Sequence, residues 1–163
     1  MINDTEIAYL PIHSRTEFPI LLVEDDLAIV DTLRRTAKTY FPEATIIPVT
    51  TFEEAVVYFY NLEGKGPRLV LLDVLLPGGH TGLDFLQLLK SHPLGRLLPV
   101  IVLSRSEDAT HVKEAYRLGA AAFSNKPCSF SEWKRFLIDL RLYWYETASL
   151  PQTYFEKQQE QNH

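Results

Sequence analysis

The sequence predicts an α/β fold in which a doubly wound, five-stranded parallel sheet is covered by helices on both faces. Short apolar runs alternate five times with segments of helical period along the middle of the chain. Runs such as "LVLL" (69–72) and "VIVL" (100–103) are apolar without alternation, which indicates parallel strands that are buried on both faces. The chain has 163 residues, of which 46% are hydrophobic, enough for one domain with a substantial core.

The first strand is expected at Pro19–Val23 and the first helix at Leu27–Tyr40. In that helix Ile29, Leu33 and Ala37 recur at helical spacing and share one face. This pairing of a buried strand with an amphipathic helix is the first β–α unit.

The second unit combines a strand at Ala44–Val49 with a helix in the segment 51–62. Thr51 and Glu54 form a capping box at the start of the helix. Pro48 cannot donate a hydrogen bond within a sheet, so the second strand is predicted to lie at an edge.

Three further units follow the same alternation. The remaining strands are expected at Arg68–Leu72, Pro99–Leu103 and Ala121–Ser124, and the remaining helices at about Gly82–Ser91, at about Asp108–Leu118, and from Ser129 onward. The last helix is long and amphipathic. Its predicted apolar stripe consists of Phe130, Trp133, Phe136, Leu137, Leu140 and Trp144.

These elements define a domain at residues 18–146, with an N-terminal extension at 1–17 and a C-terminal tail at 147–163. The tail ends in the polar stretch "QTYFEKQQEQNH" and is expected to be frayed.

Composition limits the classes of function. The net charge is −5 and the basic residues are scattered, so nucleic-acid binding is not expected. No apolar run approaches the roughly 20 residues of a membrane span, and the single cysteine, Cys128, fits a reducing compartment. We expect a cytoplasmic protein.

Polar residues stand at the ends of four predicted strands. Glu24 and Asp25, within "EDD", follow the first strand, Asp73 the third, Ser104 the fourth and Lys126 the fifth. Any one of them has an ordinary explanation, because an Asp after a strand usually caps the next turn. Since a doubly wound sheet binds ligands beyond the carboxyl ends of its strands, the whole set predicts one site.

Physical chemistry suggests a role for each group. Clustered carboxylates repel one another unless one is protonated or a cation joins them, and Mg²⁺ suits a site with carboxylate and phosphoryl oxygens. Asp73, apart from the acidic pair, can act as a nucleophile and form an aspartyl phosphate. Lys126 would add positive charge, and the Ser104 hydroxyl would donate to a phosphoryl oxygen.

The motifs "LLVEDD", "LVLLDVLLPGG", "PVIVLSRS" and "LGAAAFSNKP" resemble, in order and spacing, the receiver domains of two-component response regulators. The resemblance implies the flavodoxin-like (βα)5 receiver fold and a sensor histidine kinase as partner. It also implies that Asp73 is the phosphoacceptor, and that Glu24 and Asp25 hold Mg²⁺ beside it. Ser104 would be the switch hydroxyl, Phe123 the switch aromatic and Lys126 the site lysine, with a cis peptide bond before Pro127.

A narrower resemblance concerns "KSHPLGRLLPVIVLS" and "LYWYETASLP", which look like the single-domain regulators of bacterial phytochrome histidine kinases. It implies a phytochrome-type kinase and a homodimer formed through the C-terminal helix region. Tyr143, Trp144 and Tyr145 point around most of a helix, and with Leu150 they lack obvious cover in a monomer.

Two features depart from the receiver pattern. The loop "GGHTG" is one residue longer than usual, and Arg105 stands where a small residue is usual. A guanidinium there would either crowd the phosphodonor or bind the phosphoryl group.

Three other functions share part of this pattern. A pseudo-receiver would keep the fold without phosphotransfer, and a phosphorelay intermediate would pass the phosphoryl group to a second histidine. An aspartate-nucleophile phosphatase of the haloacid-dehalogenase type needs a second Asp two residues after the nucleophile, where this chain has Leu75. A DNA-binding output is not expected, because only residues 146–163 follow Tyr145. We therefore expect a stand-alone receiver rather than a turnover enzyme.

Overall fold

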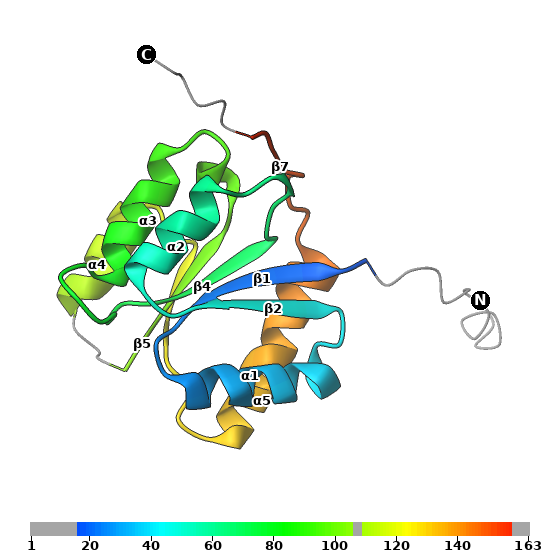
Figure 1. The fold of residues 1–163 in the computed structure, drawn as a ribbon. Helices are drawn as coiled ribbons and strands as arrows, with labels where there is room; N and C mark the ends of the chain where they lie inside the picture. The colour runs from blue at the N-terminus through cyan, green and yellow to red at the C-terminus, as the bar shows by residue number, and fades with distance from the viewer. Residues whose placement is uncertain (1–15, 106–108, 158–163) are drawn as a thin grey trace, which may run out of the picture.

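The structure, a computed structural model, describes residues 16–105 and 109–157 (Figure 1). Its centre is a five-stranded sheet in the order β2-β1-β4-β5-β6, in which all neighbouring strands are parallel. The strands are β1 (Phe18–Val23), β2 (Ala44–Val49), β4 (Leu69–Asp73), β5 (Val100–Ser104) and β6 (Ala122–Asn125). The predicted fold class is confirmed.

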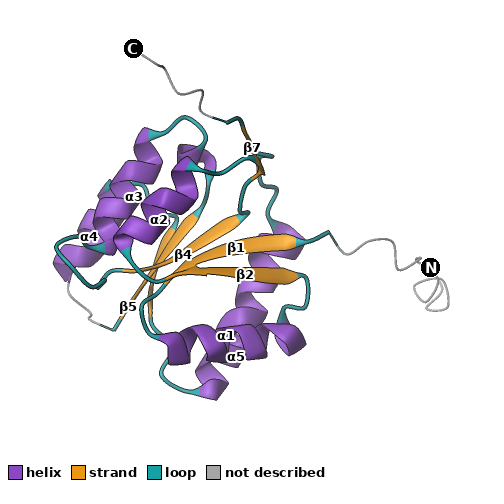
Figure 2. Ribbon diagram, viewed as in Figure 1, coloured by secondary structure: helices purple, strands orange, loops and turns teal. Residues whose placement is uncertain are grey.

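Helices cover both faces of the sheet (Figures 1 and 2). One layer contains α1 (Leu27–Tyr40) and α5 (Phe130–Leu140), and the other α2 (Phe52–Tyr60), α3 (Gly82–Ser91) and α4 (Ala109–Arg117). Successive residues of β4 alternate between the two layers: Leu71 packs with α1 and α5, and Leu72 packs with α2 and α3. Because both faces are buried, the strand is apolar throughout, as predicted.

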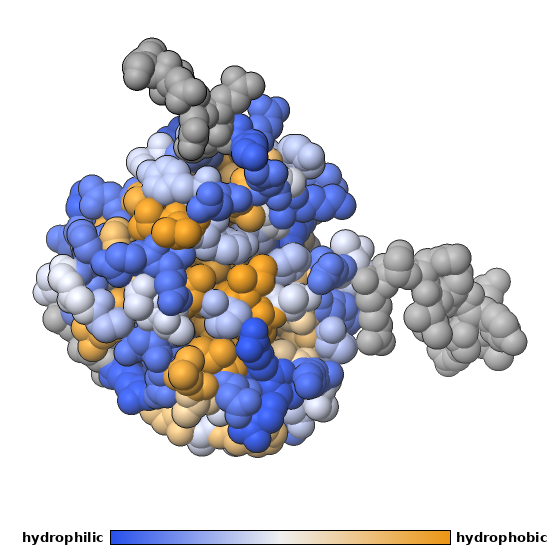
Figure 3. All heavy atoms as spheres, in the orientation of Figure 1, coloured by the Kyte–Doolittle hydropathy of each residue, from blue (hydrophilic) through white to orange (hydrophobic). Residues whose placement is uncertain are grey.

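The second β–α unit forms one half of its predicted capping box. The Thr51 side chain accepts a hydrogen bond of 3.0 Å from the Glu54 N–H, but the Glu54 carboxylate accepts one of 2.8 Å from the N–H of Thr50 rather than from that of Thr51. β2 is an edge strand, which confirms the prediction from Pro48. Figure 3 shows an apolar area near this edge, and the proline limits pairing of the edge with another chain.

The last helix matches its predicted stripe with one exception. Trp133, Leu137 and Leu140 are buried, whereas Phe130 is 60% exposed. Helical spacing identifies a face but not how far along the helix that face meets the sheet, so the expectation for Phe130, the first residue of α5, was wrong. A π-helical extension, η3 (Arg141–Thr147), continues the helix.

The extension is held at the amino edge of the sheet, where the strands begin. Arg141 donates two hydrogen bonds of 2.8 Å to the carboxylate of Glu43, a buried residue that directly precedes β2. Tyr145 packs edge-on against Phe18, with 5.8 Å between the ring centroids.

The expectation of uncovered aromatics is therefore wrong for most of the set. Trp144, Tyr145 and Leu150 are partly buried against the core beneath α1 and α5, whereas Tyr143 remains 56% exposed. After η3 the chain runs back to Arg68, directly before β4. Arg68 supports this course by donating hydrogen bonds to the carbonyls of Leu150 and Pro151.

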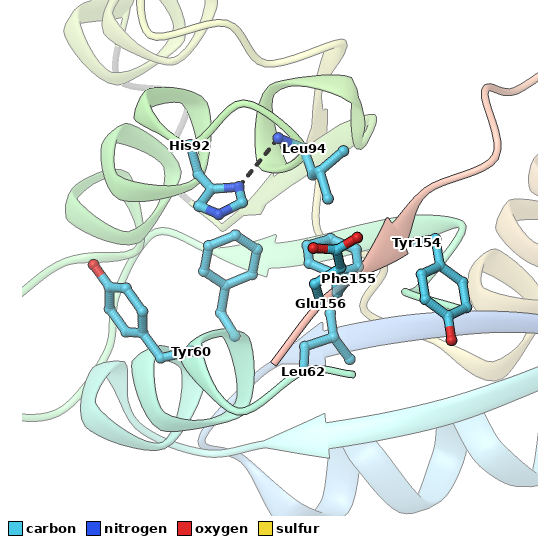
Figure 4. Close-up of a pocket in the computed structure, with 8 residues that line it drawn as sticks. Tyr60, Leu62, His92, Leu94, Tyr154, Phe155 and Glu156 are labelled. Carbon is cyan, nitrogen blue, oxygen red and sulfur yellow. Dashed lines mark hydrogen bonds between the residues drawn. The ribbon is translucent and has the colours of Figure 1, made fainter. Parts of the chain in front are cut away.

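The end of the described chain is also ordered, so the expectation of fraying is wrong for Thr153–Phe155. β7 (Tyr154–Phe155) pairs antiparallel with β3 (Gly64–Lys65). Phe155 is buried beside Phe59 and His92 (Figure 4). A single apolar anchor in a polar segment has no periodicity, so the sequence pattern did not reveal it.

The Phe155 ring requires a glycine directly after the paired strand β3. A Cβ atom added at Gly66 would lie 2.3 Å from that ring. The expected N-terminal extension at residues 1–15, the start of the fourth helix at Asp108 and the last residues, 158–163, lie outside the described part of the chain.

Candidate functional site

The predicted strand-end residues meet at the carboxyl edge of the sheet. Lys126, directly after β6, donates a hydrogen bond of 2.9 Å to Asp73 Oδ2 at the end of β4. Its Nζ atom also lies 2.6 Å from Glu24 Oε2, directly after β1. The lysine therefore joins two strands to which β6 is not paired.

Three carboxylates lie close together beside this lysine. The side chains of Glu24, Asp25 and Asp73 can place one oxygen each within 4.8 Å of the other two. Glu24 and Asp73 are buried, whereas Asp25 is exposed. Oxygen ligands with one open side are the donor set of a hard divalent cation, so these residues could hold such an ion.

Burial shifts the charge balance within the cluster. It raises the pKa of Glu24, and the hydrogen bond from Lys126 only partly opposes this effect. Burial alone would lower the pKa of Lys126, but its hydrogen bonds to Glu24 and Asp73 outweigh that effect and raise it. The lysine is thus held charged among carboxylates that it cannot fully neutralise.

Backbone groups orient the two buried carboxylates. Asp73 Oδ1 accepts a hydrogen bond of 3.1 Å from the Leu75 N–H, and Glu24 Oε1 accepts one of 3.1 Å from the Asp26 N–H. Each acid is therefore held by the turn that follows its own strand. The lysine contacts their other oxygens.

Ser104, the last residue of β5, is 1% exposed. Its carbonyl accepts a hydrogen bond of 2.9 Å from the Lys126 N–H, and β5 also pairs with β4, in the register Asp73 opposite Leu103. The predicted hydroxyl thus follows directly after the residue paired with Asp73. All five predicted residues of the acceptor site come together at this edge.

Phe123 lies farther back, within β6. It is partly buried against the core on the α2, α3 and α4 side, and its N–H donates a hydrogen bond of 3.3 Å to the Tyr116 hydroxyl on α4. The described residues contain no cis peptide bond, so the expectation of one before Pro127 was wrong.

Sequence reasoning missed the role of Gly82. A Cβ atom at this position would lie 1.9 Å from the carbonyl oxygen of Asp73. The N–H of Gly82 donates a hydrogen bond of 2.8 Å to the Val74 carbonyl. α3 therefore begins against the backbone of the acidic strand end, which only a glycine permits. A glycine at the start of the third predicted helix was the available signal.

The two unusual features of the sequence lie close to the site. Arg105 is exposed and its guanidinium lies 3.9 Å from Asp26 Oδ2. In the longer loop, the ring of His80 stacks on Phe52 with 4.1 Å between centroids, and its Nδ1 lies 3.5 Å from Asp84. The loop is thus anchored to the first turn of α2.

Two hollows lie away from the carboxylates. One of about 300 Å³ is lined by Phe59, His92, Phe155 and neighbouring residues (Figure 4). His92 Nδ1 accepts a hydrogen bond of 3.1 Å from the Leu94 N–H there, so the imidazole supports the backbone. Another of about 730 Å³ lies at the amino edge, beside Trp144 and Tyr145. Neither hollow includes a residue of the predicted site.

Comparison with known proteins decides the family. Residues 20–137 match the response regulator receiver domain. This chain belongs to the response regulator receiver family. The match confirms the family and the fold that the sequence predicted. Receiver domains are signalling proteins that pair with sensor histidine kinases.

Individual receiver proteins resemble the chain over most of its length. It is 34% identical over 132 residues to the probable methanogenesis regulatory protein FilR2 of Methanothrix harundinacea, covering 78% of this chain and 83% of FilR2. It is 28% identical over 137 residues to response regulator Rcp1 of Synechocystis, covering 81% and 92%.

Solved structures extend the likeness to phytochrome regulators. The phosphorylated cyanobacterial phytochrome response regulator RcpA superposes with a TM-score of 0.76 at 26% identity, covering 83% of this chain and 99% of RcpA. The Mn²⁺-bound form of Rcp1 gives a TM-score of 0.72 at 26% identity, covering 82% and 99%. Among the described residues of the present receiver, no helix has the length and apolar character of a membrane span.

Proposed function

We propose that this receiver accepts a phosphoryl group on Asp73 from the phosphohistidine of a sensor kinase. The observation that carries the proposal is the position of Asp73, a carboxylate at the end of a buried strand, 2.9 Å from Lys126 and beside two further acids. A carboxylate oxygen of Asp73 forms a bond to phosphorus while the bond from phosphorus to the kinase imidazole nitrogen breaks. Lys126 offsets the charge on the phosphoryl oxygens.

Mg²⁺ is the proposed cofactor, with Glu24, Asp25 and Asp73 as its protein ligands. Three oxygen ligands that leave an open side fit a cation that keeps several waters and also binds a phosphoryl oxygen. The Mn²⁺-bound form of the similar protein Rcp1 supports the binding of a divalent ion by a receiver of this kind.

Ser104 and Phe123 are the proposed switch. A Ser104 hydroxyl drawn toward the phosphoryl group would vacate space that an aromatic on the neighbouring strand β6 can fill. The resulting repacking would change the surface of α4, β6 and α5. We expect Ser104→Ala to be phosphorylated but to lose any phosphorylation-dependent change in partner binding. A normal switch in that variant would mean that the coupling uses another route.

A phytochrome-type histidine kinase is the proposed partner, since RcpA and Rcp1 resemble the chain over four fifths of its length. Phosphotransfer should be faster from a purified phytochrome-type kinase than from an unrelated histidine kinase at equal concentration. Equal rates from both kinases would contradict the assignment.

A homodimer through the C-terminal helix region is also proposed. Its basis is narrower than the sequence indicated, because only Leu142 and Tyr143 of η3, with Phe130 and Ile138 of α5, are exposed large apolar residues there. Sedimentation of the full chain and of Tyr143→Ser should show a concentration-dependent dimer that the substitution weakens. A protein that stays monomeric at tens of micromolar, phosphorylated or not, would contradict it.

The alternative functions predict different chemistry. A pseudo-receiver would not become phosphorylated, and a phosphorelay intermediate would deliver the phosphoryl group to a histidine phosphotransfer protein. A phosphatase of the haloacid-dehalogenase type would need an acid at position 75, where the side chain is Leu75 and is 63% exposed.

Intact mass spectrometry after incubation with acetyl phosphate and Mg²⁺ tests the main proposal. One acyl phosphate, stable to acid and labile to base, should form on the wild type and on Asp31→Asn, an exposed-carboxylate control on α1. Asp73→Asn should remain unlabelled. Persistent labelling of Asp73→Asn would contradict the assignment of the acceptor, and an unlabelled wild type would support the pseudo-receiver.

A further inference from the structure

The contact between Arg105 and Asp26 joins the ends of two strands that are not neighbours in the sheet. Arg105 directly follows β5, and Asp26 lies three residues after the end of β1. In the sheet β4 lies between β1 and β5, and β4 ends on Asp73. A contact from the end of β5 to the end of β1 therefore passes over the strand end that carries the proposed phosphoacceptor.

The ion pair between Arg105 and Asp26 is weak enough to open. Its two charged groups are 3.9 Å apart, and the side chains of Arg105 and Asp26 are 65% and 46% exposed. An exposed ion pair of this kind contributes at most about 1 kcal/mol. Asp26 does not need it, because its other oxygen, Oδ1, caps α1 by accepting a hydrogen bond of 3.0 Å from the Ala28 N–H.

A phosphoryl group on Asp73 would bind Arg105 more strongly than Asp26 does. A phosphoryl group on Asp73 would place a dianion beneath the guanidinium, whereas Asp26 offers a single charge. Planar arginine binds phosphate oxygens through two parallel hydrogen bonds. Lys126 is buried and already held by Glu24 and Asp73, so of these two cations the exposed Arg105 is the one that can change partner.

We propose that Arg105 is a phosphoryl-binding residue of the acceptor site, which exchanges Asp26 for the phosphoryl group once Asp73 is phosphorylated. This inference rests on the proposed function of Asp73. It chooses between the two roles that the sequence left open for Arg105, crowding of the donor and binding of the phosphoryl group. The covalent chemistry is unchanged, since Arg105 makes only hydrogen bonds to oxygens already on phosphorus.

Beryllofluoride with Mg²⁺, which mimics an aspartyl phosphate without turnover, provides the test. We expect Arg105→Ala to weaken its apparent affinity, measured by ¹⁹F NMR at fixed Mg²⁺, by about fivefold. Arg105→Lys should restore only part of the loss, because a point charge lacks the planar pair of donors. Arg35→Ala, which opens the exposed Arg35–Asp31 pair on α1, should bind as the wild type does.

Asp26→Asn tests the exchange itself. Asparagine keeps an oxygen for the cap of α1 but releases Arg105, so beryllofluoride affinity should rise about twofold to threefold. In the Arg105→Ala background most of this gain should disappear. If the effects of the two substitutions on beryllofluoride affinity are additive, Arg105 does not exchange Asp26 for the phosphoryl group.

Mg²⁺ binding separates a direct role of Arg105 from a structural one. The loss of a cation beside an acidic cluster should leave Mg²⁺ affinity unchanged or slightly higher in Arg105→Ala. Unchanged beryllofluoride affinity, or an equal fall in the affinities for both ions, would overturn the proposal. A wild type that binds no beryllofluoride would instead contradict the proposed function of Asp73.

Discussion

The two edges of the sheet differ in the kind of side chains that they bury. At the carboxyl edge, Glu24 and Asp73 are buried together with Lys126, next to the exposed Asp25. At the amino edge, the returning chain inserts Phe155 into one core layer and packs Leu150 against the other. The carboxyl edge thus concentrates negative charge that Lys126 does not balance. The amino edge consists of apolar contacts and paired hydrogen bonds.

This difference separates function from stability. Buried carboxylates with too little positive charge destabilise a fold but prepare it to bind a cation and a phosphoryl group. The amino edge compensates by joining η3 to Glu43, directly before β2, and the end of the described chain to β3. Substitutions at the amino edge should therefore lower the free energy of unfolding and spare phosphorylation, and charge removal at the carboxyl edge should do the reverse.

The largest effect is expected from Phe155→Ala. Removal of this buried ring leaves a cavity beside Phe59 and His92, so the free energy of unfolding should fall by about 3–4 kcal/mol. Urea denaturation measures the change. Its neighbour Tyr154, 69% exposed, is the control, and Tyr154→Ala should change stability by less than about 0.5 kcal/mol. Equal effects of the two substitutions would show that the segment does not pack as described.

A second test removes the ion pair at the same edge. Arg141→Met leaves the carboxylate of Glu43, whose side chain is 1% exposed, without its two hydrogen bonds from arginine. Breaking such a buried pair should lower the free energy of unfolding by about 3 kcal/mol. The exposed Arg35–Asp31 pair is the matched control, and Arg35→Met should change stability by less than about 0.5 kcal/mol. A small effect of Arg141→Met would mean that the aromatic contacts alone stabilise the amino edge.

Gly82 tests whether the carboxyl edge also depends on packing. In Gly82→Ala the new methyl group would meet the Asp73 carbonyl, so we expect a loss of about 2 kcal/mol together with slower labelling by acetyl phosphate. Gly79→Ala is the control in the same loop, because a Cβ atom there meets nothing within 4 Å. Normal labelling of Gly82→Ala would mean that the acceptor tolerates a shift of its backbone.

The difference between the carboxyl edge and the amino edge also explains which features the sequence could predict. Asp73, Lys126 and Glu24 were found because each ends a strand whose apolar run is visible in the sequence, and parallel strands bring their carboxyl ends together. Pro48 identified the edge strand for a similarly local reason. At the amino edge, the Arg141–Glu43 pair joins residues 98 positions apart, and Phe155 is one anchor in a polar segment. Neither has a period or a neighbouring motif, so only the tertiary structure reveals them.

The smallest effect, and the one of opposite sign, is expected from Asp25→Ala. Without divalent cations this substitution removes one of three clustered carboxylates, so the free energy of unfolding should rise by about 0.5–1 kcal/mol. With Mg²⁺ at 100 times its dissociation constant, the wild type should gain about 2.7 kcal/mol and the variant little. The order of their melting temperatures should therefore reverse when Mg²⁺ is added. Asp31→Ala, an exposed carboxylate on α1, should respond to Mg²⁺ as the wild type does. If Asp25→Ala is less stable without Mg²⁺ and still responds fully to it, the cation lies elsewhere and the two edges do not differ as described.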